Sequence, residues 1–165
     1  MSASVDAPAR DRAWRAAAAV LDPEVPVLTI DDLGVLRDVA VDADGRVVVV
    51  ITPTYSGCPA MDAIRDDVVS ALQASGFDDV SVQTVLAPAW TTDWMTDDGR
   101  RKLLEYGVAP PQPRGSGPVS VVLSLRCPQC GSPDTRELSR FGSTACKSLW
   151  VCNACREPFD YFKAH

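Results

Sequence analysis

Residues 47–76 read VVVVITPTYSGCPAMDAIRDDVVSALQASG, which predicts a buried strand, a short loop and an amphipathic helix in succession. The run Val47–Ile51 is apolar on both faces, as is typical of a central strand. Pro59 suits the first position of a helix, because its missing N–H costs nothing there. The apolar residues that follow recur at helical spacing and end near Gly76. The stretch therefore predicts a helix packed on a sheet.

Elements of the same kind are expected on both sides of this stretch. They are a helix over 9–21, strands over 35–41 and 80–86, and a helix over 96–106 that Thr96 caps. The order of helix, two strands, helix, strand and helix predicts an α+β fold with helices on a short sheet. We assign this domain to residues 1–108.

A change in composition marks a second part of the chain. Residues 109–118 are rich in proline and glycine and are interpreted as a linker. Residues 119–165 hold five of the six cysteines and are expected to form a ribbon of short β-hairpins, opened by a strand over 119–125. The chain is thus predicted to be a small helix-on-sheet domain followed by a zinc-ribbon-like β module.

Charge and hydropathy exclude several classes of function. The net charge of −6 argues against a protein that binds nucleic acid or an anionic membrane, since both need a basic surface. No apolar run approaches the ~20 residues that a membrane span requires. The apolar stretch near the N-terminus is too short for a signal peptide, so we predict a cytoplasmic protein.

Two C-x-x-C pairs carry the strongest chemical signal. Cys127 with Cys130, and Cys152 with Cys155, offer the four thiolates that Zn²⁺ takes in tetrahedral geometry. Gly131 allows a turn that directs backbone N–H groups at sulfur. Disulfides are disfavoured in a reducing cytosol, and neither pair sits where a redox-active C-x-x-C motif would. Zinc is the expected ion, and an iron–sulfur cluster on the same thiolates is the alternative.

Two further cysteines remain open between a chemical and a structural role. Cys58 stands where the helix at Pro59 begins, and the positive end of a helix favours a thiolate that can bind a soft metal. Cys146 is followed by Lys147, which also favours a thiolate. Either cysteine is equally well explained as a small buried hydrophobic residue.

Other candidate groups have a structural interpretation that we favour. The acids of two loops are expected to cap turns rather than to form a catalytic pair; they are Asp22, Glu24, Asp31 and Asp32. Three large side chains, Trp90, Trp94 and Met95, are expected in the core rather than on a docking patch.

The first domain resembles a known family. The segments DPEVP at 22–26, DLGV at 32–35, TPT at 52–54 and GCP at 57–59 look like the domain shared by SufT and the cytosolic iron–sulfur targeting factors. That resemblance implies a role in maturation or insertion of iron–sulfur clusters. It also implies that Cys58 is the reactive residue. We expect Cys58, assisted by Cys146 of the second part, to make transient contact with a cluster or metal.

From about Trp14 to Lys163 the chain is similar to the PaaD family, encoded with the phenylacetyl-CoA epoxidase system. PAWTTDWM at 88–95 and FGSTACK at 141–147 carry this resemblance, whereas Ala164 stands where the family pattern has a cysteine. It implies an accessory protein, not an enzyme, that matures the iron–sulfur cluster of the epoxidase reductase or another metal centre. A non-catalytic component of the complex and a thiol oxidoreductase are the alternatives, and a homodimer is left open.

Overall fold

The strand Val47–Ile51 (β2) lies at the centre of a three-stranded sheet, as its apolar run predicts. The computed structural model describes residues 7–112 and 124–165, which divide into two compact units, Met1–Trp90 and Thr91–His165. In the first unit β2 runs antiparallel to β1 (Leu36–Val41) and parallel to β3 (Val80–Thr84). The prediction of a central strand is confirmed.

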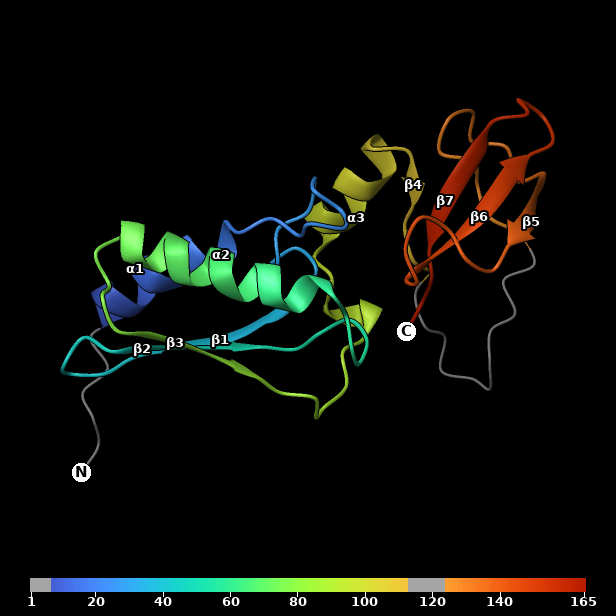
Figure 1. Ribbon diagram of the computed structural model, residues 1–165. Coiled ribbons are helices and arrows are strands. Elements are labelled where there is room, and N and C mark those ends of the chain that lie inside the picture. Colours follow the sequence, from blue (N-terminus) through green and yellow to red (C-terminus); the bar gives the residue numbers. More distant parts are fainter. Residues whose placement is uncertain (1–6, 113–123) are drawn as a thin grey trace. The chain divides into compact units, whose positions relative to one another are not determined.

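Two helices cover one face of this sheet. Figure 1 shows α1 (Ala7–Ala18) and α2 (Ala60–Ala74) side by side over the same face of β1, β2 and β3. Alternate side chains of β2, namely Val47, Val49 and Ile51, are fully buried, as expected for a central strand with one face covered by helices. The order and packing confirm the predicted α+β class for this part of the chain.

The second unit is built mainly from strands. It contains the short 3-10 helix η1 (Thr92–Trp94), α3 (Asp97–Glu105) and the strands β4 (Val108–Ala109), β5 (Thr135–Ser139), β6 (Lys147–Cys152) and β7 (Pro158–Phe162). The strands form a sheet in the order β4-β7-β6-β5, with only the β4–β7 pair parallel. The predicted ribbon of β-hairpins is confirmed in β5, β6 and β7.

Several predicted boundaries differ from those of the structure. The helix expected to reach Leu21 ends at Ala18, because Leu21 instead forms an isolated antiparallel bridge with Thr29. The strand expected over 80–86 ends at Thr84. The helix α3 begins at Asp97, directly after the predicted cap Thr96. Thr96 Oγ1 accepts a hydrogen bond from the Gly99 N–H at 3.0 Å.

The division between the compact units falls before α3, because α3 packs on β4 and β4 pairs with β7. The predicted first domain, residues 1–108, extends past this division. That residues 1–108 fold as one domain stays a prediction. The start of the expected linker is occupied by β4. The remainder of that linker, and most of the strand expected over 119–125, lie outside the described residues.

Candidate metal centre and the thiol of the first unit

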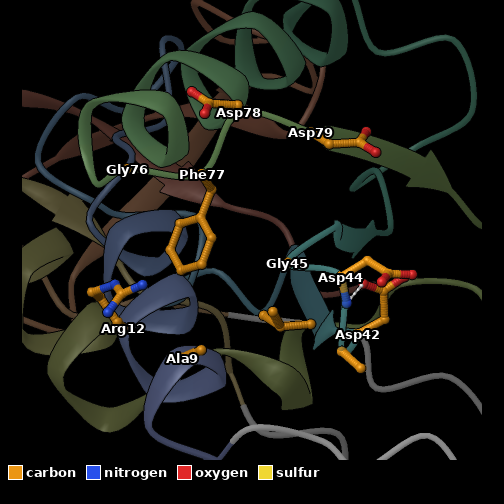
Figure 2. Close-up of a pocket in the computed structure, with 11 residues that line it drawn as sticks. Ala9, Arg12, Asp42, Asp44, Gly45, Gly76, Phe77, Asp78 and Asp79 are labelled. Atoms are coloured by element: carbon orange, nitrogen blue, oxygen red, sulfur yellow. Dashed lines mark hydrogen bonds between the residues drawn. The ribbon is translucent and has the colours of Figure 1, made fainter.

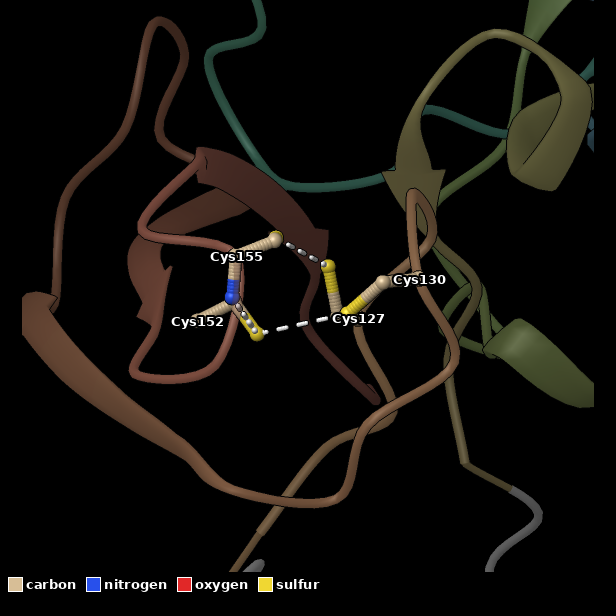
Figure 3. A group of neighbouring side chains, drawn as sticks. All are labelled: Cys127, Cys130, Cys152 and Cys155. Carbon is tan, nitrogen blue, oxygen red and sulfur yellow. Dashed lines mark hydrogen bonds between the residues drawn. The ribbon is translucent and has the colours of Figure 1, made fainter.

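The four cysteines of the two C-x-x-C pairs come together at one point of the second unit. Their sulfur atoms all lie within 4.8 Å of one another. Figure 3 shows the four side chains, which come from two facing turns. The Sγ atoms of Cys127 and Cys155 are 3.7 Å apart, and those of Cys130 and Cys152 are 3.6 Å apart. All are free thiols, since a disulfide would need about 2.05 Å.

This spacing fits a single tetrahedral ion. With Zn–S bonds of about 2.3 Å, the edge of a regular tetrahedron of sulfur atoms is about 3.8 Å. Thiolates bound to different irons of an iron–sulfur cluster are spread further apart than ligands that share one ion. The sulfur positions therefore fit zinc without rearrangement, and they fit a cluster only if the turns separate.

Two turns of the same construction hold the cysteines. In each, the N–H that follows the second cysteine donates to the carbonyl of the first, at 2.8 Å from Gly131 to Cys127 and 2.9 Å from Arg156 to Cys152. Both of the donating residues have positive φ, 74° for Gly131 and 64° for Arg156. A non-glycine side chain is disfavoured in that region, so the second turn is held in a less favourable backbone conformation.

Backbone N–H groups point at sulfur in both turns, as the sequence predicts for the first of them. The N–H of Gln129 donates to Cys127 Sγ at 3.4 Å, and the N–H of Cys155 donates to Cys152 Sγ at 3.5 Å. Such donors favour the thiolate over the thiol. The Cys155 N–H is the main reason that the pKa of Cys152 is lowered to about 7.

The closeness of the four sulfur atoms opposes the ionisation of all four thiols at once. The backbone N–H of Glu157 favours the Cys155 thiolate, but burial and the sulfur atoms of Cys152, Cys130 and Cys127 outweigh it and raise the pKa of Cys155 to about 12. Four thiolates within 4.8 Å repel one another unless a cation lies among them. The donor set thus has the chemistry of a metal site.

The core beneath the cysteines is small. Trp150 and Tyr161 make an edge-to-face contact with ring centroids 6.3 Å apart, and two of the cysteines, Cys127 and Cys152, belong to the same buried cluster. A core of this size rarely stabilises a fold by itself, so a bound ion would supply much of the stability of these strands.

Replacing Arg156 by glycine is expected to stabilise the second turn. Glycine adopts φ of 64° without the strain that Arg156 bears, and the expected gain in the free energy of unfolding is about 1 kcal/mol. The matched change Gly131→Ala places a side chain at φ 74° in the first turn and should lower stability by a similar amount. Thermal unfolding of the metal-loaded protein measures both; a loss of stability in Arg156→Gly would contradict this account.

Cys146 lies outside the four-cysteine group. Its side chain is buried, and Cys146 Sγ lies 2.9 Å from Thr144 Oγ1. Lys147 beside it is also buried and donates from Nζ to Ser143 Oγ at 3.0 Å. These contacts fit the packed-core interpretation, and the alternative of a transient metal contact stays a prediction.

Cys58 sits in the loop that leads into α2. The helix is capped by Pro59 and begins at Ala60, and the Met61 N–H donates to the Cys58 carbonyl at 3.3 Å. The Cys58 side chain is half-buried. The cysteine lies next to the start of the helix, but Pro59 and not Cys58 holds the capping position, one residue later than the sequence predicts.

The expectation that this position lowers the pKa of the Cys58 thiol is wrong. Burial raises its pKa, and the nearby carboxylates of Glu24 and Asp22 raise it further. The Ala60 N–H and the Tyr55 hydroxyl act in the opposite direction without overcoming burial. Sequence reasoning missed this because the two acids lie more than thirty positions before Cys58, and because no pattern pointed to Tyr55.

Neutralising Glu24 is expected to make Cys58 react faster. At neutral pH the thiol is protonated, so its alkylation rate follows the thiolate fraction and rises about tenfold per pH unit below the pKa. Glu24→Gln removes one charge that raises the pKa and should increase the rate a few-fold at pH 7.5.

The readout for Glu24→Gln is the rate of iodoacetamide labelling of Cys58, followed by peptide mass spectrometry. Asp66→Asn is the matched control, because Asp66 is an exposed acid on α2. Equal acceleration in both variants would mean that overall charge, and not the neighbour of Cys58, sets the rate.

The loop acids and large side chains mostly have the structural roles that the sequence favours. Asp22 Oδ1 accepts two hydrogen bonds at 2.8 Å from the N–H groups of its own turn, and Asp32 Oδ2 accepts one at 3.0 Å from the Thr29 N–H. Burial raises the pKa of Asp31, with a smaller contribution from Asp32. Trp90 and Met95 are buried as predicted.

Among the described residues, no helix is both long and apolar enough to cross a bilayer.

Comparison with known proteins divides the chain in two. The family described as "Iron-sulfur cluster assembly protein" matches residues 10–84, and the family described as "PaaD zinc beta ribbon domain" matches residues 112–163. The second match spans all four cysteines of the candidate metal centre.

Individual relatives agree with this division. A protein of Escherichia coli (strain K12), provisionally named as a subunit of 1,2-phenylacetyl-CoA epoxidase, is 47% identical over 161 residues, which are 98% of this chain and 96% of the relative. An Fe-S protein maturation auxiliary factor of Porphyromonas gingivalis (strain ATCC BAA-308 / W83) is 38% identical over 89 residues, 53% of this chain and 81% of the relative.

Among solved structures, a domain of unknown function from Bacillus anthracis, called DUF59, superposes with a TM-score of 0.55 at 28% identity. It covers 58% of this chain and 92% of that one. The shared fold therefore accounts for most of that solved domain. Because the match to the Escherichia coli relative runs through both units and through the metal-centre cysteines, the chain belongs to the PaaD family.

Proposed function

We propose that the protein is an accessory factor of phenylacetyl-CoA epoxidase that assists maturation or insertion of the iron–sulfur cluster of its reductase, or of another metal centre of the complex. The supporting observation is the combination in one chain of two parts. One is similar to iron–sulfur maturation factors and presents a half-buried thiol. The other matches the family described as "PaaD zinc beta ribbon domain" and brings four cysteines together.

The proposed role of Cys58 is to contact the cargo. Because burial and two carboxylates keep this thiol protonated, it is not a nucleophilic thiolate in the absence of a metal. An iron ion or cluster that approaches would displace the proton, since a coordinating thiol is deprotonated outright. A thiol that ionises only on meeting a metal can take up cargo and release it when protonated again. The same property counts against a thiol oxidoreductase, which needs a thiolate at rest.

The proposed role of the four-cysteine site is to hold a resident zinc ion. Cys127, Cys130, Cys152 and Cys155 would supply all four ligands, which leaves no open position for a substrate. Such a closed site is structural, and the ion would fix the turn that precedes β5 to the turn that joins β6 and β7. An iron–sulfur cluster on these cysteines is the alternative.

A loading experiment tests the function. The protein is charged anaerobically with iron and sulfide, mixed with the apo-reductase, and the visible spectrum and electron-transfer rate of the reductase are followed. We expect faster loading than from iron and sulfide alone. Equal rates, together with stable co-purification with the oxygenase components, would favour a structural role in the complex instead.

A further inference from the structure

The two outer strands of the first sheet differ in how they are protected. On β1, a register irregularity between Leu36 and Asp38 interrupts the ladder, and Arg10 Nε donates to the Val39 carbonyl at 2.9 Å. Bulges, charges and capped carbonyls are the usual means of preventing further strand pairing. The β1 edge is therefore closed to another strand.

The β3 edge is less protected: Arg65 of α2 donates to the Thr84 hydroxyl at 3.0 Å, but the ladder to β2 is regular and, among the described residues, no side chain donates to a β3 carbonyl. Its residues Val80–Thr84 read VSVQT, without a charge or a proline, and in the described part of the chain β3 pairs only with β2. The ladder to β2 uses the Asp79 carbonyl at one end and the Val85 N–H at the other. Hydrogen bonds in such a ladder recur at every second residue, so Val80, Val82 and Thr84 direct their N–H and C=O groups outward.

An acidic hollow lies at the end of the sheet where β3 begins. It has a volume of about 390 Å³, its lining includes Phe77, and four aspartates surround it, Asp42, Asp44, Asp78 and Asp79. Figure 2 shows Asp42 and Asp44 on one side of the Phe77 ring and Arg12 on the other. The Arg12 guanidinium stacks on that ring at 4.7 Å, and Asp79 is partly balanced by Arg46 at 3.9 Å. The carboxylates outnumber the cations.

We propose that β3 is a docking edge for an extended segment of a partner protein that carries lysine or arginine. The segment adds a fourth strand to the sheet through the outward groups of Val80, Val82 and Thr84, and its cationic side chains reach the aspartates at the start of β3. Main-chain pairing supplies the affinity in this mode, and the flanking charges select the partner. The occupant is a partner and not a second copy, because the β3 strand of a second copy, VSVQT, would bring no lysine or arginine to these aspartates. The proposal goes beyond the proposed function, since it concerns peptide binding and not cluster loading.

The test uses the full-length, metal-loaded protein and a ten-residue probe of alternating valine and threonine with two lysines at each end. Amide hydrogen exchange, read by NMR, should slow at Val80, Val82 and Thr84 when the probe is added. Exchange at Ser81 and Gln83, already bonded to β2, should change little. A control probe with glutamate in place of lysine should bind about tenfold more weakly at low salt, and the difference should shrink at high salt.

Variants separate the backbone from the charges. Val82→Pro removes one outward N–H without removing a bond to β2 and should abolish binding. Asp78→Lys should weaken the lysine probe about tenfold and leave folding intact, because Asp78 is exposed; Asp66→Lys on α2 is the control of equal charge. Unchanged exchange at the three amides, or equal binding of both probes, would overturn the proposal. Slowed exchange that depends on protein concentration without a probe would identify a second copy as the occupant and would equally overturn it.

Discussion

Replacing Cys152 by serine is expected to release the resident ion and unfold the strands of the second unit. Cys152 is fully buried at the end of β6, and its sulfur lies 3.6 Å from that of Cys130. A structural zinc ion contributes on the order of 10 kcal/mol to folding, more than a core this small can replace. The loss should therefore be a loss of structure and not a small shift in stability.

Metal content and amide exchange measure the effect of Cys152→Ser. We expect about one zinc per chain in the unmodified protein, much less in the variant, and fast exchange throughout β5, β6 and β7. The control is Cys146→Ser, which changes a buried thiol outside the four-cysteine group and should retain the zinc. Slow exchange in these strands after Cys152→Ser would show that the module folds without its ion. Iron and sulfide in place of zinc would favour the alternative cofactor.

Local patterns predict the parts of this fold whose partners are close in sequence. The helix α2 follows from apolar residues at helical spacing, and β2 follows from five apolar residues in a row, because a strand buried in a sheet needs no polar face. The thiols of one turn come together because only two residues separate them. Each of these features depends on neighbours within about one turn or one strand.

Features that depend on distant pairing were not available from pattern alone. The strand β4 has two residues, and only its pairing with β7, about fifty positions later, makes it part of the second sheet. The pKa of Cys58 depends on Glu24 and Asp22, which a loop brings close to it. The positive φ of Arg156 is a partial exception, because it occupies the place in the second C-x-x-C turn that Gly131 holds in the first.

Replacing Cys58 by alanine is expected to leave the fold intact and to reduce cluster loading of the reductase to the rate of iron and sulfide alone. Cys58 is half-buried in a loop, and its backbone carbonyl, which the substitution retains, accepts the hydrogen bond from Met61 at the start of α2. Removing a partly exposed thiol typically costs about 1 kcal/mol or less. The sulfur is, in contrast, the atom that the proposed cargo would meet.

The Cys58→Ala experiment compares loading rates and thermal unfolding in the same preparations. Ser56→Ala, two residues earlier in the same loop, is the control and should load the reductase normally. Loading by the unmodified protein should also rise with pH through the neutral range, because the raised pKa of Cys58 leaves few thiolates at pH 7. Full loading with Cys58→Ala would remove Cys58 from the mechanism. Since the proposed zinc site has no free position for cargo, contact with the cargo would then rest on Cys146 alone, or the protein would act in the epoxidase complex by structural contact.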